Sequence, residues 1–403
     1  MTHVLLTPSW YPTPDNLTIG SFFREQAHAL KKAGLEVGVI APQLRSVRLL
    51  GRSGRGLPTG IEYWDDGGIP TWLKHGYAWL PRIPHGDSYL WLKAGHALWE
   101  RYLSRHGRPD LIHAHSSLYG GVLAAEIGRR YGIPYVVTEH GTCFARNVVP
   151  AWQMRLTRMA FGHARARIAV SPELGRLLEA RFDHAMRPWT CIPNMVDRMF
   201  RPPDAESGRK DHSCFRFLNV AFLREKKGQA DLLRATALAF QGDRSVQLRI
   251  GGDGPCRGRL ADLAGQLGIQ DQVAFLGNLK REAVLAEMQS CDAFVLSSHF
   301  ETFGVVVIEA LACGKPVIAT ICGGPESIIQ GANGRLVSPR NERHLAEAMI
   351  KMREEIADYD GESIRRECLS RFGEEALVRR LLAVYQDVTG LKGPLAARRE
   401  QAA

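Results

Sequence analysis

Apolar runs that read as β-strands alternate with helical patterns along most of the chain, and this alternation constrains the fold more than any other feature of the sequence. In the first half, runs such as "HVLLT", "DLIHAH" and "PYVVTEH" are separated by helical stretches. The second half repeats this rhythm from "FRFLNVAFL" to "PVIATIC". Strand–helix alternation predicts parallel βαβ units. The two series therefore predict an α/β protein of two Rossmann-like, doubly wound domains that face each other across a cleft.

A polar stretch rich in proline, "CIPNMVDRMFRPPDAESGRKDHS", separates the two series. Such stretches are typical of domain boundaries. We therefore expect an N-terminal domain over residues 1–195 and a second domain over 196–372. A C-terminal helix over 373–391 is expected to pack back on the N-terminal domain, and residues 392–403 are expected to be disordered.

The positive charge is concentrated in the first half of the chain. Residues 1–195 contain 23 basic and 14 acidic residues, and all eight tryptophans. Five of these tryptophans lie between residues 44 and 110, where the strand–helix rhythm breaks, and we expect a long irregular insertion there. A basic, aromatic surface predicts an anionic partner such as phosphate, an acidic sugar, a lipid headgroup or nucleic acid. Core tryptophans and an uneven spread of charge explain the same counts.

Several classes of protein do not fit the sequence. No run approaches the roughly 18 apolar residues that a membrane span needs. The first residues, "MTHVLLTPSWYP", lack the pattern of a secretory signal. The eight cysteines are scattered without a CxxC pair, so neither a disulfide framework nor a zinc site is expected. These features favour a cytoplasmic protein.

The stretch "DAFVLSSHFETFGVVVIEALACGKPVIAT" contains the most specific candidate site. It predicts a buried strand, a turn with Glu301, and a helix that starts near Gly304 and contains Glu309. Ligands of open α/β sheets bind where strands end, and free N–H groups at a helix start bind anions. The amides of Phe303, Gly304 and Val305 therefore suit a diphosphate, and the two carboxylates suit sugar hydroxyls. The alternative is a capping Glu301 and a salt-bridged Glu309.

Other predicted strands of the second half also end in glycine-rich turns. These are "RIGGDGP", "FLGNL" and "ICGGPESI", and glycines there leave space for a ligand along the sheet edge. None fits GxGxxG followed by an acidic residue, so NAD is not expected. Lys227 precedes Gly228 at a predicted helix start, where its ammonium group suits a phosphate oxygen. A solvated basic loop is the alternative.

In the first half, candidate residues follow three predicted strands. His113 and His115 share one face of a strand end, and His140 ends the next strand. Two histidines would need a third ligand to hold zinc, and core histidines are the common alternative. Gly20 opens the first predicted helix, where it would let the backbone approach a diphosphate from the opposite domain.

Taken together, these motifs resemble the family 4 retaining glycosyltransferases of the GT-B fold. The most specific match is the E-x7-E motif formed by Glu301 and Glu309. Further matches are "HAHSSLYGG", "EHGT", "IPNMVD", "EKKG", "GGDGP", "FLGNL" and "GGPESI", so the resemblance extends from Gly20 to about Pro339. One departure concerns the Gly-Arg pair that precedes the lysine loop in the family, because this chain has Ala221 and Phe222 there.

The resemblance implies that Glu301 holds the donor sugar and Glu309 the ribose, while Lys227 and the helix amides bind the diphosphate. It implies His115, Lys227 and Glu301 as catalytic residues, and an acceptor side that contains His115 and His140. The implied donor-binding residues are Gly20, Arg224, Lys227, Gly252, Asp253, Gly277, Leu279, Glu301, Thr302, Phe303, Gly304, Val305 and Glu309. Arg224 is a candidate to replace the missing family arginine.

The function that follows is a metal-independent, retaining hexosyltransferase with a UDP- or GDP-sugar as substrate and no cofactor. The acceptor would be a glycan or a lipid-linked molecule of cell-surface polysaccharide or glycolipid synthesis. The acceptor-sized aromatic insertion argues for transfer, against a GT-B sugar-nucleotide epimerase. A non-catalytic nucleotide-sugar or nucleic-acid binding protein is a further alternative, but no nucleic-acid recognition motif is present.

Two groups of arginines predict weak, peripheral binding to the inner face of an anionic membrane. The first group precedes the tryptophan-rich stretch, and the second shares one face of a predicted helix near Trp152. These residues are Arg45, Arg48, Arg52 and Arg55, and Arg155, Arg158 and Arg165.

Overall fold

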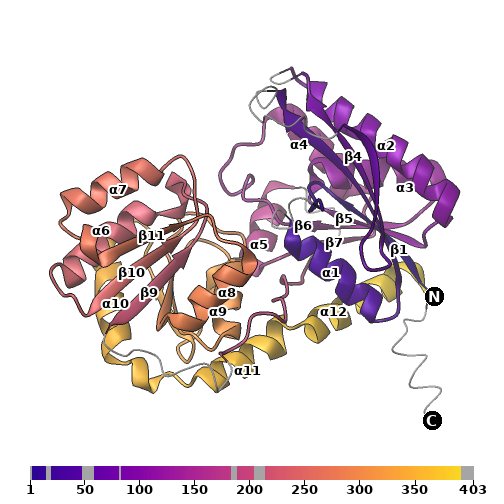
Figure 1. The fold of residues 1–403 in the computed structure, drawn as a ribbon. Coiled ribbons are helices and arrows are strands. Elements are labelled where there is room, and N and C mark those ends of the chain that lie inside the picture. Colours follow the sequence, from indigo (N-terminus) through magenta and orange to yellow (C-terminus); the bar gives the residue numbers. More distant parts are fainter. Residues whose placement is uncertain are drawn as a thin grey trace, which may run out of the picture. The chain divides into compact units, whose positions relative to one another are not determined.

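The computed structural model describes residues 2–14, 20–47, 59–80, 83–182, 188–203 and 214–391 of the 403-residue chain. The chain divides into two compact units (Figure 1). Unit 1 consists of Met1–Val170, Gly175–Ile192 and Leu377–Ala403, and unit 2 of Ser171–Leu174 and Pro193–Ala376. The expected tail over 392–403, part of the polar boundary stretch, and Arg48, Arg52 and Arg55 lie outside the described residues.

Unit 1 contains an eight-stranded sheet in the order β3-β4-β2-β1-β5-β6-β7-β8. Its strands pair in parallel except β3 and β4, which are antiparallel neighbours. The strands are β1 (His3–Pro8), β2 (Glu36–Ser46), β3 (Gly60–Asp65), β4 (Pro70–Ala78), β5 (Leu111–His115), β6 (Tyr135–Glu139), β7 (Ala166–Ala169) and β8 (Trp189–Cys191).

Helices connect most of these strands, as the alternating pattern predicts. They are α1 (Ser21–Lys32), α2 (Gly86–His106), α3 (Val122–Tyr131), α4 (Ala151–Gly162), α5 (Pro172–Arg181) and α12 (Glu374–Thr389), with a π-helical turn η2 (Ser117–Gly121) before α3. The second part of α12 belongs to unit 1, where the Tyr385 hydroxyl lies 2.6 Å from Nδ1 of the buried His113. This contact anchors α12 to strand β5.

The expectation of a long irregular insertion over residues 44–110 is wrong. Strand β2 continues to Ser46, and the hairpin of β3 and β4 and the long helix α2 follow. Of the tryptophans in this region, Trp72, Trp91 and Trp99 are buried in the core, whereas Trp79 is 61% exposed. Large aromatic side chains in such a stretch favour a functional loop, but most of these tryptophans fill the space between α2 and the sheet.

Unit 2 contains a six-stranded sheet in the order β11-β10-β9-β12-β13-β14, and every neighbouring pair is parallel. This is the strand order of the doubly wound dinucleotide-binding fold. The strands are β9 (Phe215–Val220), β10 (Val246–Gly251), β11 (Val273–Gly277), β12 (Ala293–Leu296), β13 (Val317–Thr320) and β14 (Gly334–Val337).

The helices of unit 2 are α6 (Gln229–Phe240), α7 (Arg257–Gln266), α8 (Arg281–Ser290), α9 (Val305–Ala312), α10 (Glu342–Glu354) and α11 (Gly361–Phe372). Short 3₁₀ turns are η3 (Glu225–Lys227), η4 (Gln270–Gln272), η5 (Pro325–Ser327) and η6 (Ile356–Asp358). The helices expected to begin near Gly228, Lys280 and Gly304 start one residue after these positions. The predicted fold class, with two Rossmann-like α/β domains, is confirmed.

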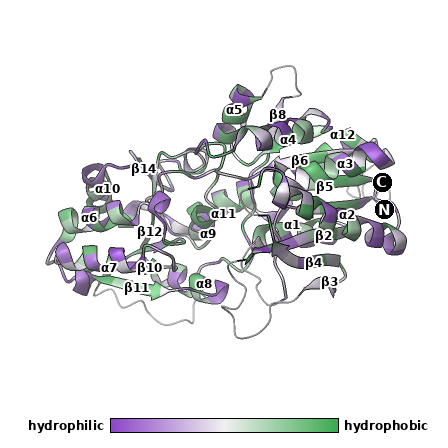
Figure 2. Ribbon diagram, turned by 90° about the horizontal axis from the view of Figure 1, so that it is seen from above, coloured by the Kyte–Doolittle hydropathy of each residue, from purple (hydrophilic) through white to green (hydrophobic). Residues whose placement is uncertain are grey.

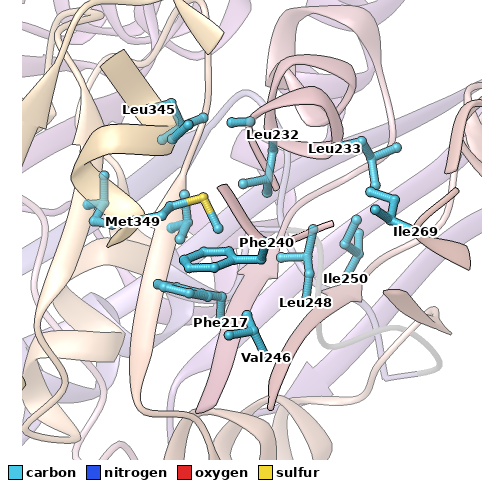
Figure 3. Packing of buried hydrophobic residues seen from close by; sticks show 14 of the residues in the cluster. Phe217, Leu232, Leu233, Phe240, Val246, Leu248, Ile250, Ile269, Leu345 and Met349 are labelled. Atoms are coloured by element: carbon cyan, nitrogen blue, oxygen red, sulfur yellow. The ribbon is translucent and has the colours of Figure 1, made fainter. Parts of the chain in front are cut away.

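The core of unit 2 lies between the sheet and helices α6, α7 and α10 (Figure 3). The rings of Phe217 on β9 and Phe240 on α6 are stacked 5.9 Å apart, and Met349 of α10 belongs to the same buried cluster. Figure 2 shows that hydrophobic residues lie on central strands such as β5 and β6, whereas hydrophilic residues lie on outer helices such as α10. Burial of each such side chain stabilises the folded state by about 1.5–3 kcal/mol.

Among the described residues, we find no helix with the length and apolar character that a bilayer crossing requires.

Candidate functional site

Strands β9 and β12 lie side by side in unit 2, and the chain leaves them toward opposite halves of the sheet. Ligands of open α/β sheets bind at this point, beyond the carboxyl ends of the strands. The turn after β9 contains Lys227, and the turn after β12 contains Glu301. Nζ of Lys227 lies 2.5 Å from Oε2 of Glu301, and both side chains are largely buried. The fold therefore joins two residues that are 74 positions apart in sequence.

The turn around Glu301 is fixed by its backbone. The Glu301 N–H donates to the Cys322 carbonyl at 3.0 Å, and the Gly324 N–H donates to the Glu301 carbonyl at 2.8 Å. A Cβ at Gly324 would lie 2.2 Å from Cα of Phe303, so only glycine fits there. The glycines of "ICGGPESI" therefore let two loops pack together, and the expectation that they clear space for a ligand is wrong.

The other two glycine-rich turns differ from each other: one serves loop packing and the other leaves the end of a strand open. A Cβ at Gly252, with φ +126°, would lie 2.0 Å from the Ala221 carbonyl oxygen, so this glycine also serves loop packing. The carbonyl of Asp253 accepts from the Leu223 N–H at 2.9 Å. Gly277, with φ +70°, has no atom within 4 Å of the position of a Cβ, so the end of β11 is open. Leu279 lies against the end of β10, within 2.7 Å of a Cβ built on Gly251.

Helix α9 begins directly after Gly304, which has a left-handed φ of +101°. Thr302 and Phe303 form the turn before it, and the Phe303 ring is buried 5.7 Å from the ring of Phe372. The first N–H groups of any helix have no acceptor within that helix. Helix α9 starts four residues after Glu301, and its first amides are of the kind that bind phosphate oxygens.

Glu309 is buried in α9 and is 7% exposed. Burial raises the pKa of its carboxyl group to about 7, Arg281 opposes this shift, and the negative Asp197 adds to it. Arg281 Nη1 lies 3.6 Å from Glu309 Oε1, and Arg281 Nη2 lies 3.1 Å from Asp197 Oδ2. Glu309 thus has a cationic neighbour that is shared with a second carboxylate. Arg281 was not predicted from the sequence, because nothing near it in the chain points to Glu309.

Arg224, the candidate substitute for the family arginine, is exposed. Its guanidinium carbon lies 4.8 Å from the centre of the Phe222 ring, a stacked arrangement typical of cation–π contacts. Arg224 lines a pocket of about 460 Å³ with Gly228, His299 and residues of α6 and α7.

In unit 1, His115 is fully buried at the end of β5. Its Nδ1 lies 3.2 Å from Nε2 of His140, and its Nε2 lies 3.4 Å from the amide nitrogen of Gln26. Burial, together with the neighbouring His113 and His140, holds the pKa of His115 well below its usual value, so the imidazole is neutral. His115 is enclosed, and His140, 8% exposed, is the member of the pair that reaches the surface.

Glu139, the last residue of β6 and the sequence neighbour of His140, was not singled out from the sequence. It is fully buried, and its carboxylate accepts hydrogen bonds from the backbone amides of Ser117, His140 and Gly141 and from the Ser117 hydroxyl, at 2.8–2.9 Å. Burial raises the pKa of this carboxyl group, and the four hydrogen bonds oppose the shift. An acid at the end of an apolar strand was the signal in the sequence. The Glu139 carboxyl group holds the loop that contains His140 through these hydrogen bonds.

Two other candidates in unit 1 have structural surroundings. His113 bonds Tyr385 and the Thr138 hydroxyl, and burial lowers its pKa to about 3, as for a core histidine. Gly20 precedes α1 with a left-handed φ of +77°, and a Cβ there would lie 3.1 Å from the ring of Trp10. Gly20 is thus in unit 1, whereas the other candidate donor-binding residues are in unit 2.

Potential metal ligands do not gather into a group of three or more histidine, cysteine, aspartate or glutamate residues anywhere in the part of the chain that the structure describes.

Comparisons with known proteins bear on the family and the fold of the chain. The model of the family "Glycosyltransferase Family 4" matches residues 19–199, and that of "Glycosyl transferases group 1" matches residues 201–360. A protein assigned to teichuronic acid biosynthesis as a glycosyltransferase, TuaC of Bacillus subtilis (strain 168), is 28% identical over 87% of this chain and 89% of its own length.

Solved structures match nearly the whole chain. Sucrose-phosphate synthase from Thermosynechococcus elongatus matches with a TM-score of 0.77 and 21% identity, over 97% of this chain and 100% of that chain. HepE of Anabaena, solved in complex with UDP-glucose, matches with a TM-score of 0.70 and 19% identity, over 97% and 100%. At these identities the matches show the fold alone.

Proposed function

Since the chain belongs to the group 1, family 4 glycosyltransferases, which use nucleotide sugars, we propose that it transfers a hexose, with retention of configuration, to a hydroxyl of a glycan or lipid-linked acceptor. The product would belong to a cell-surface polysaccharide or a glycolipid. The kinship with TuaC, which is assigned to teichuronic acid biosynthesis, supports an acceptor of this kind.

The contact between Lys227 and Glu301 at the β9–β12 switch point carries this proposal. In the proposed site, the diphosphate lies between the Lys227 ammonium and the start of α9. Glu301 accepts from the donor sugar, and Glu309 accepts from the ribose. Negative charge on the diphosphate grows as the glycosidic bond breaks, so a cation and helix amides there stabilise the transition state more than the ground state.

The two units take different roles in the proposal. Unit 2 binds the donor through the residues around Lys227, Gly277 and α9. Unit 1 presents His140 to the acceptor, and the contact of Gly20 with the diphosphate stays a prediction from the sequence. Because His115 is enclosed, we assign it to holding the His140 ring through their 3.2 Å contact, in place of the direct catalytic contact expected from the sequence.

A screen of nucleoside diphosphate sugars tests the function, and UDP-sugars come first because HepE was solved with UDP-glucose. The correct donor should raise the melting temperature, since it binds only the native protein. Sugar transfer to a lipid-linked acceptor should persist in EDTA, because Lys227 and the α9 amides supply the positive field. Loss of transfer in EDTA that magnesium restores would contradict metal independence. Release of free sugar or nucleotide without an acceptor requirement would favour the epimerase.

We also propose weak binding of unit 1 to an anionic membrane from the cytoplasmic side, and the structure changes which residues carry it. Trp79, Ile83 and Tyr89 are exposed around the turn between β4 and α2. The His85 ring of this turn lies 4.7 Å from the ring of Trp152 on α4. We call Trp79, Ile83, Tyr89 and the exposed Arg155 and Arg158 of α4 the aromatic-basic surface.

Exposed aromatic and basic side chains together are typical of surfaces that contact lipid headgroups. Arg45 contributes less than expected, because it belongs to strand β2 and its Nη2 lies 3.0 Å from Nδ1 of His75. Arg165 lies beyond the end of α4 and is not on its arginine face. The eight free cysteines suit the reducing cytoplasm.

Replacing Arg155 and Arg158 with serine should weaken binding to phosphatidylserine vesicles by roughly 30-fold, at about 1 kcal/mol per basic residue. Trp79→Ser with Tyr89→Ser should weaken it further, and added salt should release the wild type. Vesicle co-sedimentation at low salt measures this. Arg259→Ser with Arg366→Ser removes equal charge from exposed positions of unit 2 and should have little effect. A further variant replaces Arg45, Arg48, Arg52 and Arg55 with serine. If only this variant loses binding, the membrane contact lies at the arginines that precede the tryptophan-rich stretch.

A further inference from the structure

Two loops at the switch point of unit 2 are bound together through their backbones. The His299 N–H donates to the Lys226 carbonyl at 2.8 Å, and the Ser297 hydroxyl donates to the Lys227 carbonyl at 3.0 Å. The first loop follows β9 and the second follows β12. The backbone of Lys227 is therefore held by the same segment that leads to Glu301.

Gly228 makes this approach possible. It has a left-handed φ of +66°, and a Cβ there would lie 1.9 Å from the Ser297 carbonyl oxygen and 3.3 Å from Cδ2 of His299. No side chain fits between the two loops, and the imidazole of His299 lies directly against the residue that follows Lys227.

The His299 side chain also reaches the helix that follows the lysine loop. Its Nε2 lies 2.7 Å from Oδ2 of Asp231, in the first turn of α6, and both side chains are less than one-fifth exposed. A hydrogen bond to a carboxylate is about twice as strong as one between neutral groups. The lysine loop is thus fixed at its backbone and at the start of the next helix.

We propose that His299 and Asp231 are positioning residues that hold the Lys227 ammonium in register with the donor diphosphate. This inference rests on the proposed function. In this proposal the two residues act through the lysine loop and not by contact with the donor. They restrain the loop, so that Lys227 meets Glu301 before the donor arrives and little order has to be gained on binding. The effect of the pair is therefore confined to the part of the donor that Lys227 contacts.

The test compares inhibition constants of the nucleoside diphosphate and of the matching nucleoside, each against the preferred donor sugar. His299→Phe keeps a ring against Gly228 and removes the bond to Asp231. It should raise the inhibition constant of the nucleoside diphosphate by about 10-fold, which is close to the contribution of one such hydrogen bond. The inhibition constant of the nucleoside should stay unchanged. Asp231→Asn retains an acceptor for the imidazole and should therefore keep most of the wild-type affinity for the diphosphate. Asp231→Ala should match His299→Phe.

Arg234→Ala is the control for stability. Arg234 is on the same helix and contacts Asp231 at 3.7 Å and Glu342 at 3.2 Å, so its loss disturbs α6 without removing the His299 bond. It should leave the ratio of the two inhibition constants unchanged. If His299→Phe and Asp231→Ala weaken the binding of nucleoside and diphosphate equally, the positioning role is overturned. It is also overturned if these variants weaken the binding of neither inhibitor. If the wild-type protein does not bind nucleoside diphosphates at all, the proposed function itself fails.

Discussion

Replacing Glu309 with glutamine is expected to stabilise the protein and to impair its use of the donor at the same time. The carboxyl group is buried, with a pKa of about 7 against 4.5 when exposed, so the folded state disfavours its charged form. A carboxyl group with a raised pKa in the folded state costs stability as the pH rises through the interval between those two values. Above about pH 7 this cost is about 3 kcal/mol, and glutamine, which stays neutral, removes it.

Chemical denaturation at several pH values measures this effect. The difference in free energy of unfolding between Glu309→Gln and the wild type should be small near pH 4.5 and should grow to about 3 kcal/mol near pH 8. A difference that does not change with pH would contradict the account of the buried charge.

The same substitution should weaken donor binding by roughly 10- to 100-fold, because a hydrogen bond to a charged acceptor contributes about 1.5–3 kcal/mol. Binding by the wild type should strengthen as the pH rises through about 7, where Glu309 becomes charged. A 2′-deoxynucleotide is a matched control. It should bind the wild type more weakly than the ribonucleotide, and the variant should no longer distinguish the two. Unchanged discrimination in Glu309→Gln would place the ribose elsewhere.

Replacing Lys227 with alanine should have the largest effect on the chemical step. Its ammonium lies 2.5 Å from the Glu301 carboxylate and is the cation that we assign to the leaving diphosphate. Loss of one group that stabilises developing charge typically lowers kcat by about 10²–10³-fold. Alanine also leaves Glu301 as an uncompensated carboxylate beside the diphosphate, so product binding should suffer as well.

A second substitution separates these two effects. Lys227→Ala combined with Glu301→Gln removes the repulsion, and it should recover part of the affinity for the nucleoside diphosphate without recovering kcat. Single-turnover rates and product inhibition constants measure the two quantities. Lys226→Ala, in the same 3₁₀ turn, is the control. If it lowers kcat as far as Lys227→Ala does, the assignment of the leaving-group cation to Lys227 is wrong.

The sequence by itself determined the fold class and most elements of both units. Strand and helix patterns are local: a buried parallel strand needs a short apolar run, and a helix needs its periodic apolar face. For this reason the starts of α6, α8 and α9 were predicted within one residue. The turns at Gly228 and Gly304 could also be predicted from the sequence, because a left-handed φ depends on the local backbone and favours glycine.

Local patterns failed where burial depends on distant partners. Trp72, Trp91 and Trp99 have no local mark that separates core residues from a binding surface, and only the packing of α2 against the sheet decides it. In the same way, the glycines at Gly252 and Gly324 were expected to make room for a ligand, but their neighbours are backbone atoms of other loops.

The chemistry of the candidate site was decided by tertiary structure. The E-x7-E spacing identifies Glu301 and Glu309, but the two carboxylates differ because of partners far away in sequence. The strand order sets β12 beside β9, and this brings Lys227 to Glu301. Glu309 of α9 is buried with Arg281 at 3.6 Å, and removal from water raises the pKa of its carboxyl group. Desolvation and charge–charge distances are properties of the folded arrangement, so the sequence names these residues and only the fold fixes their charge and contacts.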